Sequence, residues 1–297
     1  MKLIPVDVEH TLNVEPRTET SDRRMGQLLI ESGKLIAEDA DRILEVQQRD
    51  GLRFGDAAKK LGLLTEDDIQ RALARQFEYT YLRPGEGGFA PELIAAYQPF
   101  TPQVEALRAV RTQLLMRWFN TDAKRRGLSV VSPRRKEGRT YVAANLAVVF
   151  SQLGERTLLI DADMRNPRQH EILGVENRVG LSTILSGRAD TNAIQQLPVF
   201  LDLSVLTAGP VPPNLQELLE RVTFQRLMRE AIEHYDVVIM DTPAGALTAD
   251  AQTVTAVTTG ALIVTRQNST KVRDTRQLAT QIEDCGAQTV GAIINDF

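Results

Sequence analysis

The run LSVVSPRRKEGRTY, residues 128–141, decides the fold of the larger part of this chain. Its first residues, 128–132, are mostly apolar and predict a buried strand, whereas residues 141–153 predict a helix. A basic loop that contains one glycine, residues 133–140, joins the two. A loop between a strand and a helix start presents backbone N–H groups and the positive end of the helix dipole. This stretch therefore predicts a phosphate-binding loop.

Two later apolar stretches also end in aspartate. Residues 157–160 run into Asp161 and Asp163, and residues 237–240 run into Asp241. Open α/β sheets place their ligands at the carboxyl ends of strands, so these carboxylates are expected beside the phosphate loop. Apolar strands at 261–264 and 290–294, with helical stretches between, extend the pattern. We expect an α/β fold of the P-loop NTPase type, with a mostly parallel sheet and helices on both faces, preceded by a small helical N-terminal domain.

Residues 101–297 resemble bacterial tyrosine kinases of the chain-length-determinant family, especially the exopolysaccharide EpsG-type members. The most specific match is the DADMRNP box at 161–167, and residues 209–219 also resemble the proline loop of these kinases. The resemblance implies ATP and Mg²⁺ as cofactors. It implies that Asp161, Asp163 and Arg139 are catalytic, with Asp161 as the base or water-orienting group. It implies metal positions at Thr140, Asp161 and Asp241, and a phosphate cradle formed by Lys136, Glu137, Gly138, Arg139, Thr140 and Tyr141.

The phosphate loop departs from the P-loop pattern at two positions. Lys136 replaces a glycine, so a backbone φ above zero would be costlier there. Arg139 replaces the lysine that neutralises the β- and γ-phosphates, and a planar guanidinium does not simply substitute for a compact ammonium. In addition, no tyrosine follows Tyr235, so phosphorylation of a tyrosine cluster at the end of this chain is not expected.

Three functions remain open at this point. The first is an ATP/Mg²⁺-dependent protein tyrosine kinase or ATPase that regulates exopolysaccharide chain length and export, and the retained aspartates favour it. The second is a nucleotide-binding pseudokinase, a regulatory subunit of the export machinery without catalysis. The third, a partitioning or septum-site ATPase, is disfavoured because the sequence has no basic or amphipathic C-terminal helix.

The first eighty residues contain a duplication. An offset of 29 residues relates Arg24 to Arg53, Gly26 to Gly55 and Gly33 to Gly62. Residues 22–82 resemble the MshEN domain of secretion and pilus ATPases, and that resemblance implies cyclic di-GMP as a ligand. It implies that Arg24 and Arg53 contact guanines or phosphates, that Gly26 and Gly55 admit close backbone approach, and that Leu28 packs on the ligand. The alternative is a helical docking module without a ligand, because Met25, Phe54 and the pair Ala57–Ala58 depart from the family pattern.

Around these domains we expect a polar tail at 1–21 and a Pro/Gly-rich linker at 83–100 before the P-loop domain at 101–297. Glu105, Arg108 and Arg111 lie along one helical flank and resemble the assembly motif of the same kinases, which implies a homo-oligomer. The resemblance also implies a membrane-embedded chain-length-determinant partner and a cytoplasmic location at the inner membrane. A net charge of −4 argues against a nucleic-acid polymer as partner. The single cysteine, Cys285, excludes an internal disulfide.

Overall fold

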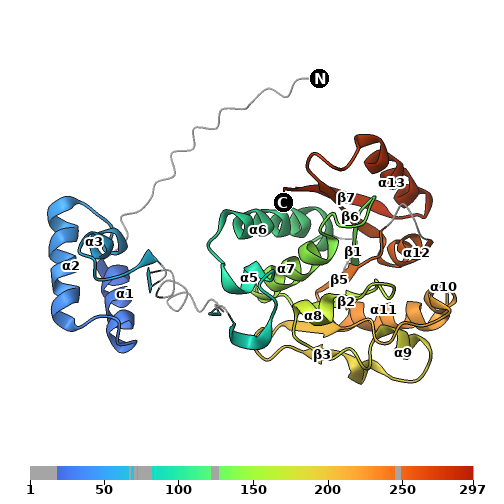
Figure 1. The fold of residues 1–297 in the computed structure, drawn as a ribbon, viewed down its shortest axis with the longest axis horizontal. Coiled ribbons are helices and arrows are strands. Elements are labelled where there is room, and N and C mark those ends of the chain that lie inside the picture. The colour runs from blue at the N-terminus through green and yellow to red at the C-terminus, as the bar shows by residue number, and fades with distance from the viewer. Residues whose placement is uncertain are drawn as a thin grey trace. The chain divides into compact units, whose positions relative to one another are not determined.

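The computed structural model describes residues 19–66, 68–69, 72, 82–83, 85–121, 127–244 and 249–296, with the side chains of residues 19–24 also left out. The predicted tail up to residue 18 and residues 73–81 of the predicted repeat lie outside this range. The chain divides into two compact units, Met1–Tyr79 and Thr80–Phe297 (Figure 1). Within the described residues, none of the helices is long and apolar enough to cross a membrane.

The N-terminal unit contains helices α1 (Glu19–Glu31), α2 (Ala37–Asp50) and α3 (Phe54–Lys60). The duplication is visible in its turns. Gly33 and Gly62 both adopt the left-handed region, with φ of 69° and 68°. Gly33 N–H donates to Ile30 O at 2.9 Å, and the equivalent bond joins Gly62 N–H to Lys59 O at the same distance. Glycine tolerates this conformation without a Cβ clash, so each repeat ends its short helix in the same way.

The two repeats share one hydrophobic core, to which Met25, Phe54, Ala57 and Ala58 all contribute buried side chains. A Cβ on Gly55 would lie 3.0 Å from the side chain of Ile69. The residues that depart from the MshEN pattern are therefore packing residues here. The close approach of helices explains one of the motif glycines without any ligand.

The larger unit begins with η1 (Glu86–Gly88), α5 (Ile94–Tyr97) and α6 (Pro102–Leu114), which continues into the π-helical turn η2 (Leu115–Phe119). Its strands are β1 (Gly127–Val131), β2 (Thr157–Asp161), β3 (Gln195–Gln196), β4 (Leu203–Leu206), β5 (Val237–Asp241), β6 (Gly260–Arg266) and β7 (Gln288–Asn295). Its remaining helices are α7 (Arg139–Ser151), α8 (Gln169–Ile172), α9 (Leu181–Leu185), η3 (Thr191–Ala193), α10 (Leu215–Leu219), α11 (Val222–His234), α12 (Ala249–Thr258) and α13 (Val272–Asp284).

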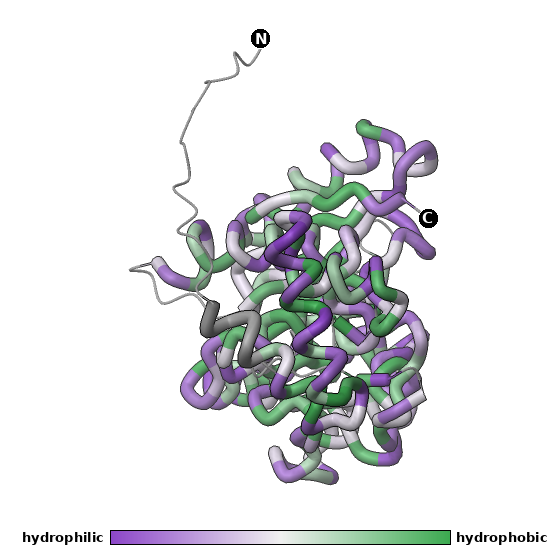
Figure 2. Tube along the Cα trace, turned by 90° about the vertical axis from the view of Figure 1, so that its left-hand side faces the viewer, coloured by the Kyte–Doolittle hydropathy of each residue, from purple (hydrophilic) through white to green (hydrophobic). Residues whose placement is uncertain are grey.

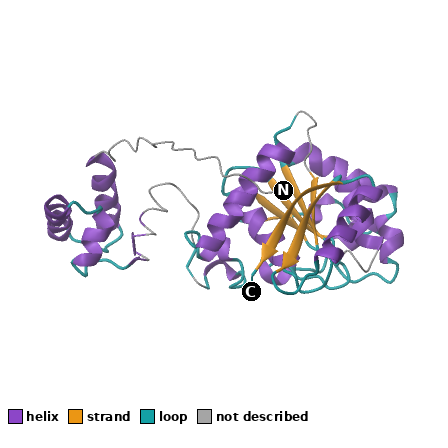
Figure 3. Cartoon of the chain, turned by 90° about the horizontal axis from the view of Figure 1, so that it is seen from above, coloured by secondary structure: helices purple, strands orange, loops and turns teal. Residues whose placement is uncertain are grey.

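The strands form one seven-stranded sheet in the order β3-β4-β2-β5-β1-β6-β7. Every pairing is parallel except that of the short strand β3 with β4. Helix α7, with α6 packed on it, lies against one face, and helices α11, α12 and α13 lie against the other. Figure 3 shows helices on both sides of the sheet. Hydrophobic and hydrophilic residues alternate along the surface helices, as expected for helices with one buried face (Figure 2). The predicted α/β fold with a mostly parallel sheet is confirmed.

The pairing of the central strands fixes what lies at the carboxyl edge of the sheet. Asp161 on β2 is directly opposite Asp241 on β5. On the other side of β5, Val130 of β1 pairs with the same Asp241. The phosphate loop, which follows β1, and the two aspartates therefore emerge from three adjacent strands at one edge of the sheet.

The segment before α6 is attached to helix α7. The side-chain amide of Asn145 accepts a hydrogen bond from Ala95 N–H at 2.9 Å and donates one to Glu92 O at 3.0 Å. Gln152 donates to Ala95 O at 3.1 Å. Residues 92–95 thus lie along the helix that follows the phosphate loop. The sequence predicts a linker here, and the structure adds that its last part is packed on α7.

Candidate functional site

The phosphate loop has two residues in the left-handed region. Gly138, which precedes helix α7, has φ of 96°, and Lys136 has φ of 61°. Between them, the carboxylate of Glu137 is buried and accepts a hydrogen bond from Arg134 N–H at 2.7 Å. The hydroxyl of Thr270 also donates to this carboxylate. These contacts hold the turn closed, so the position that normally carries glycine keeps its left-handed conformation although a lysine occupies it.

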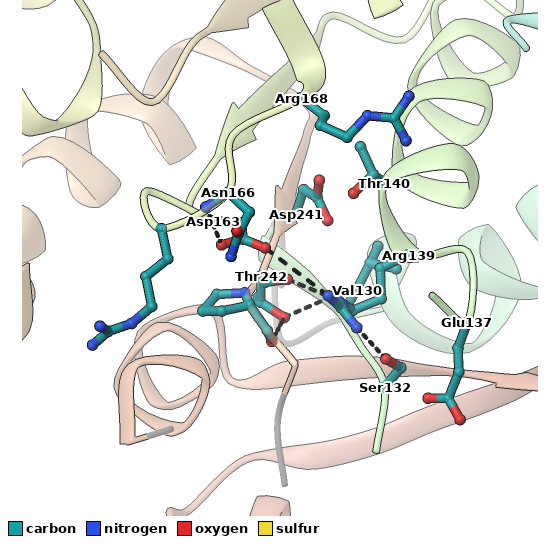
Figure 4. Close-up of polar contacts among 12 residues, drawn as sticks. Val130, Ser132, Glu137, Arg139, Thr140, Asp163, Asn166, Arg168, Asp241 and Thr242 are labelled. Carbon is teal, nitrogen blue, oxygen red and sulfur yellow. Dashed lines mark hydrogen bonds and ion pairs between the residues drawn. The ribbon is translucent and has the colours of Figure 1, made fainter. Parts of the chain in front are cut away.

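Arg139, at the position of the usual P-loop lysine, is directed back into the protein (Figure 4). Its Nε donates to Thr242 O at 2.8 Å, and its Nη1 donates to Arg134 O at 2.9 Å and to the hydroxyl of Ser132. Its Nη2 lies 4.0 Å from Asp163 Oδ2. The side chain is only 8% exposed. The guanidinium therefore joins the phosphate loop to the end of β5 through hydrogen bonds to protein acceptors.

Both carboxylate oxygens of Asp161 accept backbone hydrogen bonds. Asp163 N–H donates to Oδ1 at 3.2 Å, and the N–H groups of Arg168 and Gln169 donate to Oδ2 at 3.1 and 3.0 Å. Burial raises the pKa of Asp161 well above its ordinary value, and the charge of Asp241 raises it further. Asp161 thus shapes the loop that follows β2, and its raised pKa makes it a better proton acceptor than a solvated carboxylate.

Asp241 has one carboxylate oxygen that is occupied and one that is not. Gln169 Nε2 donates to Oδ2 at 2.9 Å, whereas Oδ1 is buried without a hydrogen-bond partner. The hydroxyl of Thr140 lies beside this carboxylate in Figure 4 and, like the amide of Gln169, lowers the pKa of Asp241. A buried oxygen acceptor next to a P-loop hydroxyl fits a hard divalent cation such as Mg²⁺, which prefers oxygen ligands and keeps several waters.

Burial raises the pKa of Asp241 to about 6, although the positive charge of Arg139 and the hydrogen bonds from Thr140 and Gln169 act in the opposite direction. Burial also raises the pKa of Asp163, whose Oδ1 accepts a hydrogen bond from Asn166 N–H at 3.1 Å. The edge of the sheet therefore holds three aspartates in a poorly solvated environment, where a bound cation would be strongly favoured.

A pocket of about 980 Å³ opens beside this edge. Six basic side chains line it, together with three acidic ones: Arg135, Lys136, Arg139, Arg165, Arg168, Arg266, Glu92, Asp163 and Asp296. Arg165 is held by the buried Asp250, Nε to Oδ2 at 2.7 Å, and Arg168 pairs with Glu92 at 2.8 Å. The volume and the excess of positive charge suit a polyphosphate ligand.

Of the predicted nucleotide residues, all but the buried Glu137 line this pocket, and Asp163 lines it too. Asp161 and Asp241 are paired at the ends of β2 and β5 and do not line it. The predicted assembly residues lie elsewhere, on α6. Arg108 pairs with Glu105, and Arg111 donates to Val149 O at 2.6 Å. The predicted cyclic di-GMP residues are in the other unit. There Arg53 is exposed, Leu28 is half-buried, and the side chain of Arg24 lies outside the described residues.

Sequence reasoning missed several residues that complete the site. Gln169 bridges Asp241 and Thr140 O, donating to the latter at 3.1 Å. Thr242 accepts the hydrogen bond from Arg139, and Glu92 reaches the pocket from the linker. Thr242 directly follows Asp241, the last residue of a predicted strand, so its place at the site could have been predicted from the sequence. Neither Gln169 nor Glu92 belongs to a spacing pattern that marks it.

The parallel sheet, the phosphate loop before α7 and the carboxylates on adjacent strand ends define a P-loop NTPase. A family model described as ParA, "NUBPL iron-transfer P-loop NTPase", matches residues 125–296. The tyrosine-protein kinase YwqD of Bacillus subtilis is 36% identical over 203 residues, which is 68% of this chain and 85% of that protein. The chain therefore belongs to the bacterial tyrosine kinase catalytic-domain family.

Solved structures agree with this assignment. The kinase domain of the Escherichia coli tyrosine kinase ETK superposes with a TM-score of 0.67 at 33% identity, covering 70% of this chain and 81% of that one. The septum site-determining protein MinD of Pyrococcus horikoshii, complexed with Mg-ADP, gives a TM-score of 0.51 at 26% identity and covers 57% and 70%. Membership of this family implies nucleotide binding with Mg²⁺.

The raised pKa of Asp241 leads to a test on the protein without nucleotide and Mg²⁺. Because its folded pKa of about 6 exceeds the ordinary value of 3.8, ionisation of Asp241 destabilises the fold as pH rises between these values. Asp241→Asn should therefore raise the Tm at pH 7.5 by several degrees, corresponding to about 1–3 kcal/mol, and the gain should disappear near pH 4. Scanning calorimetry measures this. The exposed Asp284→Asn should leave the Tm unchanged, and a lower Tm for Asp241→Asn at pH 7.5 would contradict the assignment.

Proposed function

We propose that this protein is an ATP/Mg²⁺-dependent protein tyrosine kinase that also hydrolyses ATP. One observation carries the proposal: buried Asp161 and Asp241 are paired on adjacent strands, and Asp241 keeps one unpartnered oxygen beside Thr140. Phosphoryl transfer depends chiefly on positioning and on stabilising charge, so this arrangement is the part of the site that the chemistry needs most.

Each group has a proposed role. The backbone of residues 136–141 binds the phosphates at the start of α7, while Thr140 and Asp241 hold Mg²⁺. The metal, when bound, neutralises phosphate charge. Asp161 orients or deprotonates the attacking hydroxyl, and Asp163 assists from the loop after β2. Tyr141, half-buried at the pocket wall, is the aromatic residue nearest to the loop in sequence.

The cellular role that we propose follows the resemblance to the EpsG-type kinases. The protein would regulate the chain length and export of an exopolysaccharide through a membrane-embedded chain-length-determinant partner, at the cytoplasmic side of the inner membrane. The pair of exposed Glu105 and partly buried Arg108 on α6 supports self-assembly, because Glu105 can exchange this partner for the same residue of a second copy.

We also propose that the N-terminal unit is an MshEN-like domain that binds cyclic di-GMP. The repeat of glycine turns and the exposed Arg53 at the start of α3 support it. Guanidinium groups recognise both phosphate oxygens and guanine edges.

One observation favours a second function, that of a nucleotide-binding regulatory subunit without catalysis. The guanidinium of Arg139 is committed to Thr242 O and Arg134 O, so it does not offer the transferring phosphate the charge that lysine supplies in other P-loops.

The kinase proposal is tested with purified protein, ATP and Mg²⁺, by measuring ATP hydrolysis and phosphotyrosine on a tyrosine-containing polymer. Thr140→Val removes one hydroxyl at nearly constant volume and should lower both rates about 100-fold or more. The exposed Thr112→Val on α6 should have no effect. Tight nucleotide binding without turnover in the wild-type protein would reject the kinase in favour of the regulatory subunit.

Cyclic di-GMP binding is measured by titration calorimetry on the full chain. Arg53→Ala should weaken it about tenfold or more, because a charge-assisted contact is lost. Arg42→Ala, at another exposed arginine of the same unit, serves as the matched control and should bind normally. Absence of binding heat with wild-type protein would leave the domain as a docking module.

Self-assembly through α6 is tested by light scattering. Glu105→Arg places two cations next to each other and should reduce the measured mass relative to wild type. Glu233→Arg, an equal charge change at an exposed site on α11, should not. Equal masses for wild type and Glu105→Arg would remove the proposed assembly surface.

A further inference from the structure

Two cationic residues of the phosphate loop, Lys136 and Arg139, depart from the P-loop pattern. Where the pattern has a glycine the chain has Lys136, and where it has the phosphate-binding lysine the chain has Arg139. The structure treats the two side chains very differently: Arg139 is buried, whereas Lys136 is exposed and lines the pocket.

Arg139 is not free to turn towards a ligand. Moving its guanidinium into the pocket would break the hydrogen bonds to Thr242 O, Arg134 O and the hydroxyl of Ser132. Lost bonds in a buried site are costly, because the acceptors left behind are poorly solvated. Figure 4 shows the guanidinium directed towards Ser132, Thr242 and Asp163. Through these hydrogen bonds, Arg139 holds the phosphate loop against the end of β5.

Lys136 is kept in a conformation that glycine would adopt more easily. With φ of 61°, its Cβ costs about 1 kcal/mol or more relative to glycine. The bonds from Arg134 N–H and Thr270 to Glu137 hold the turn in place whatever residue occupies position 136. A lysine at position 136 therefore does not stabilise the left-handed backbone there. We infer that the lysine is present for what its side chain can bind.

Three of the other basic residues around the loop are already paired, which leaves Arg135 and Lys136 as the exposed cations of the loop that line the pocket. Arg134 binds Asp274 at 2.6 Å, Arg165 binds Asp250, and Arg168 binds Glu92. Among the described residues, Lys136 has no carboxylate within ion-pair distance. A compact ammonium on a four-carbon stem with three donors is the group that suits a phosphate oxygen at the mouth of a P-loop.

We propose that Lys136 supplies the cation that neutralises the β- and γ-phosphates of the bound nucleotide, in place of the residue at position 139, and that Arg139 is a positioning residue. The cation has moved by three residues within the same loop. This inference rests on the proposed function only in that the protein binds a nucleoside di- or triphosphate, and it does not require turnover.

The experiment measures the Kd of ADP and of AMP, each with Mg²⁺, by titration calorimetry on the full chain. Lys136→Gly should weaken ADP about tenfold or more, because one charge-assisted phosphate contact is lost, and should leave AMP within twofold. The same variant should have a higher Tm, since glycine relieves the left-handed strain. Lys271→Ala, which removes an exposed lysine at the start of α13, should leave both affinities unchanged.

A double variant tests directly whether the cation at position 136 takes the place of the usual one at position 139. Lys136→Gly with Arg139→Lys restores the usual P-loop pattern and should recover most of the lost ADP affinity. Lys136→Asn gives a second neutral variant that tolerates the left-handed region and should behave like Lys136→Gly. ADP affinity within twofold of wild type in both single variants would overturn the inference. Failure of wild-type protein to bind ADP at all would instead overturn the proposed nucleotide function on which it rests.

Discussion

The site depends on one constraint: two carboxylates, Asp161 and Asp241, are buried next to each other on paired strands. Like charges in a poorly solvated place repel and raise each other's pKa, so the surrounding structure must compensate. Backbone N–H groups do so for Asp161, whereas Gln169, Thr140 and the charge of Arg139 do so for Asp241. Oδ1 of Asp241 is buried without a hydrogen-bond partner, and a divalent cation is the group that fits this oxygen best.

Arg139 has a central place in this electrostatic balance. A guanidinium keeps its charge at every accessible pH and forms several hydrogen bonds in fixed directions. Here those bonds join the loop after β1 to the residue that follows β5 and bring positive charge near Asp163. A lysine at this position could supply the charge, but its single ammonium nitrogen lacks the fixed, planar spread of donors with which the guanidinium reaches Thr242 O and Arg134 O. The substitution therefore strengthens the loop and at the same time removes its usual phosphate ligand.

Much of this could be predicted from sequence because it follows from regular patterns. Apolar runs that end in Asp161 and Asp241 predicted parallel strands with their ends together, and the constant offset between Gly33 and Gly62 predicted the repeat. The direction of the Arg139 side chain could not be predicted, since a guanidinium fits phosphate and backbone carbonyls equally well. Gln169 and Asn145 act across long sequence separations without any periodic signal, so only the folded chain reveals them.

The strand order also governs when the site can exist during synthesis. β1 has β5 and β6 as its only sheet neighbours among the described strands, and both belong to the last quarter of the chain. On the ribosome, the strand that carries the phosphate loop therefore stays unpaired until residues 237–266 have emerged. Among the described residues, helices α1–α3 contribute to a core whose members all lie between Met25 and Ala72, so this unit can fold long before. Nucleotide cannot assist the early stages of folding, and it can stabilise the larger unit only once nearly the whole chain is released.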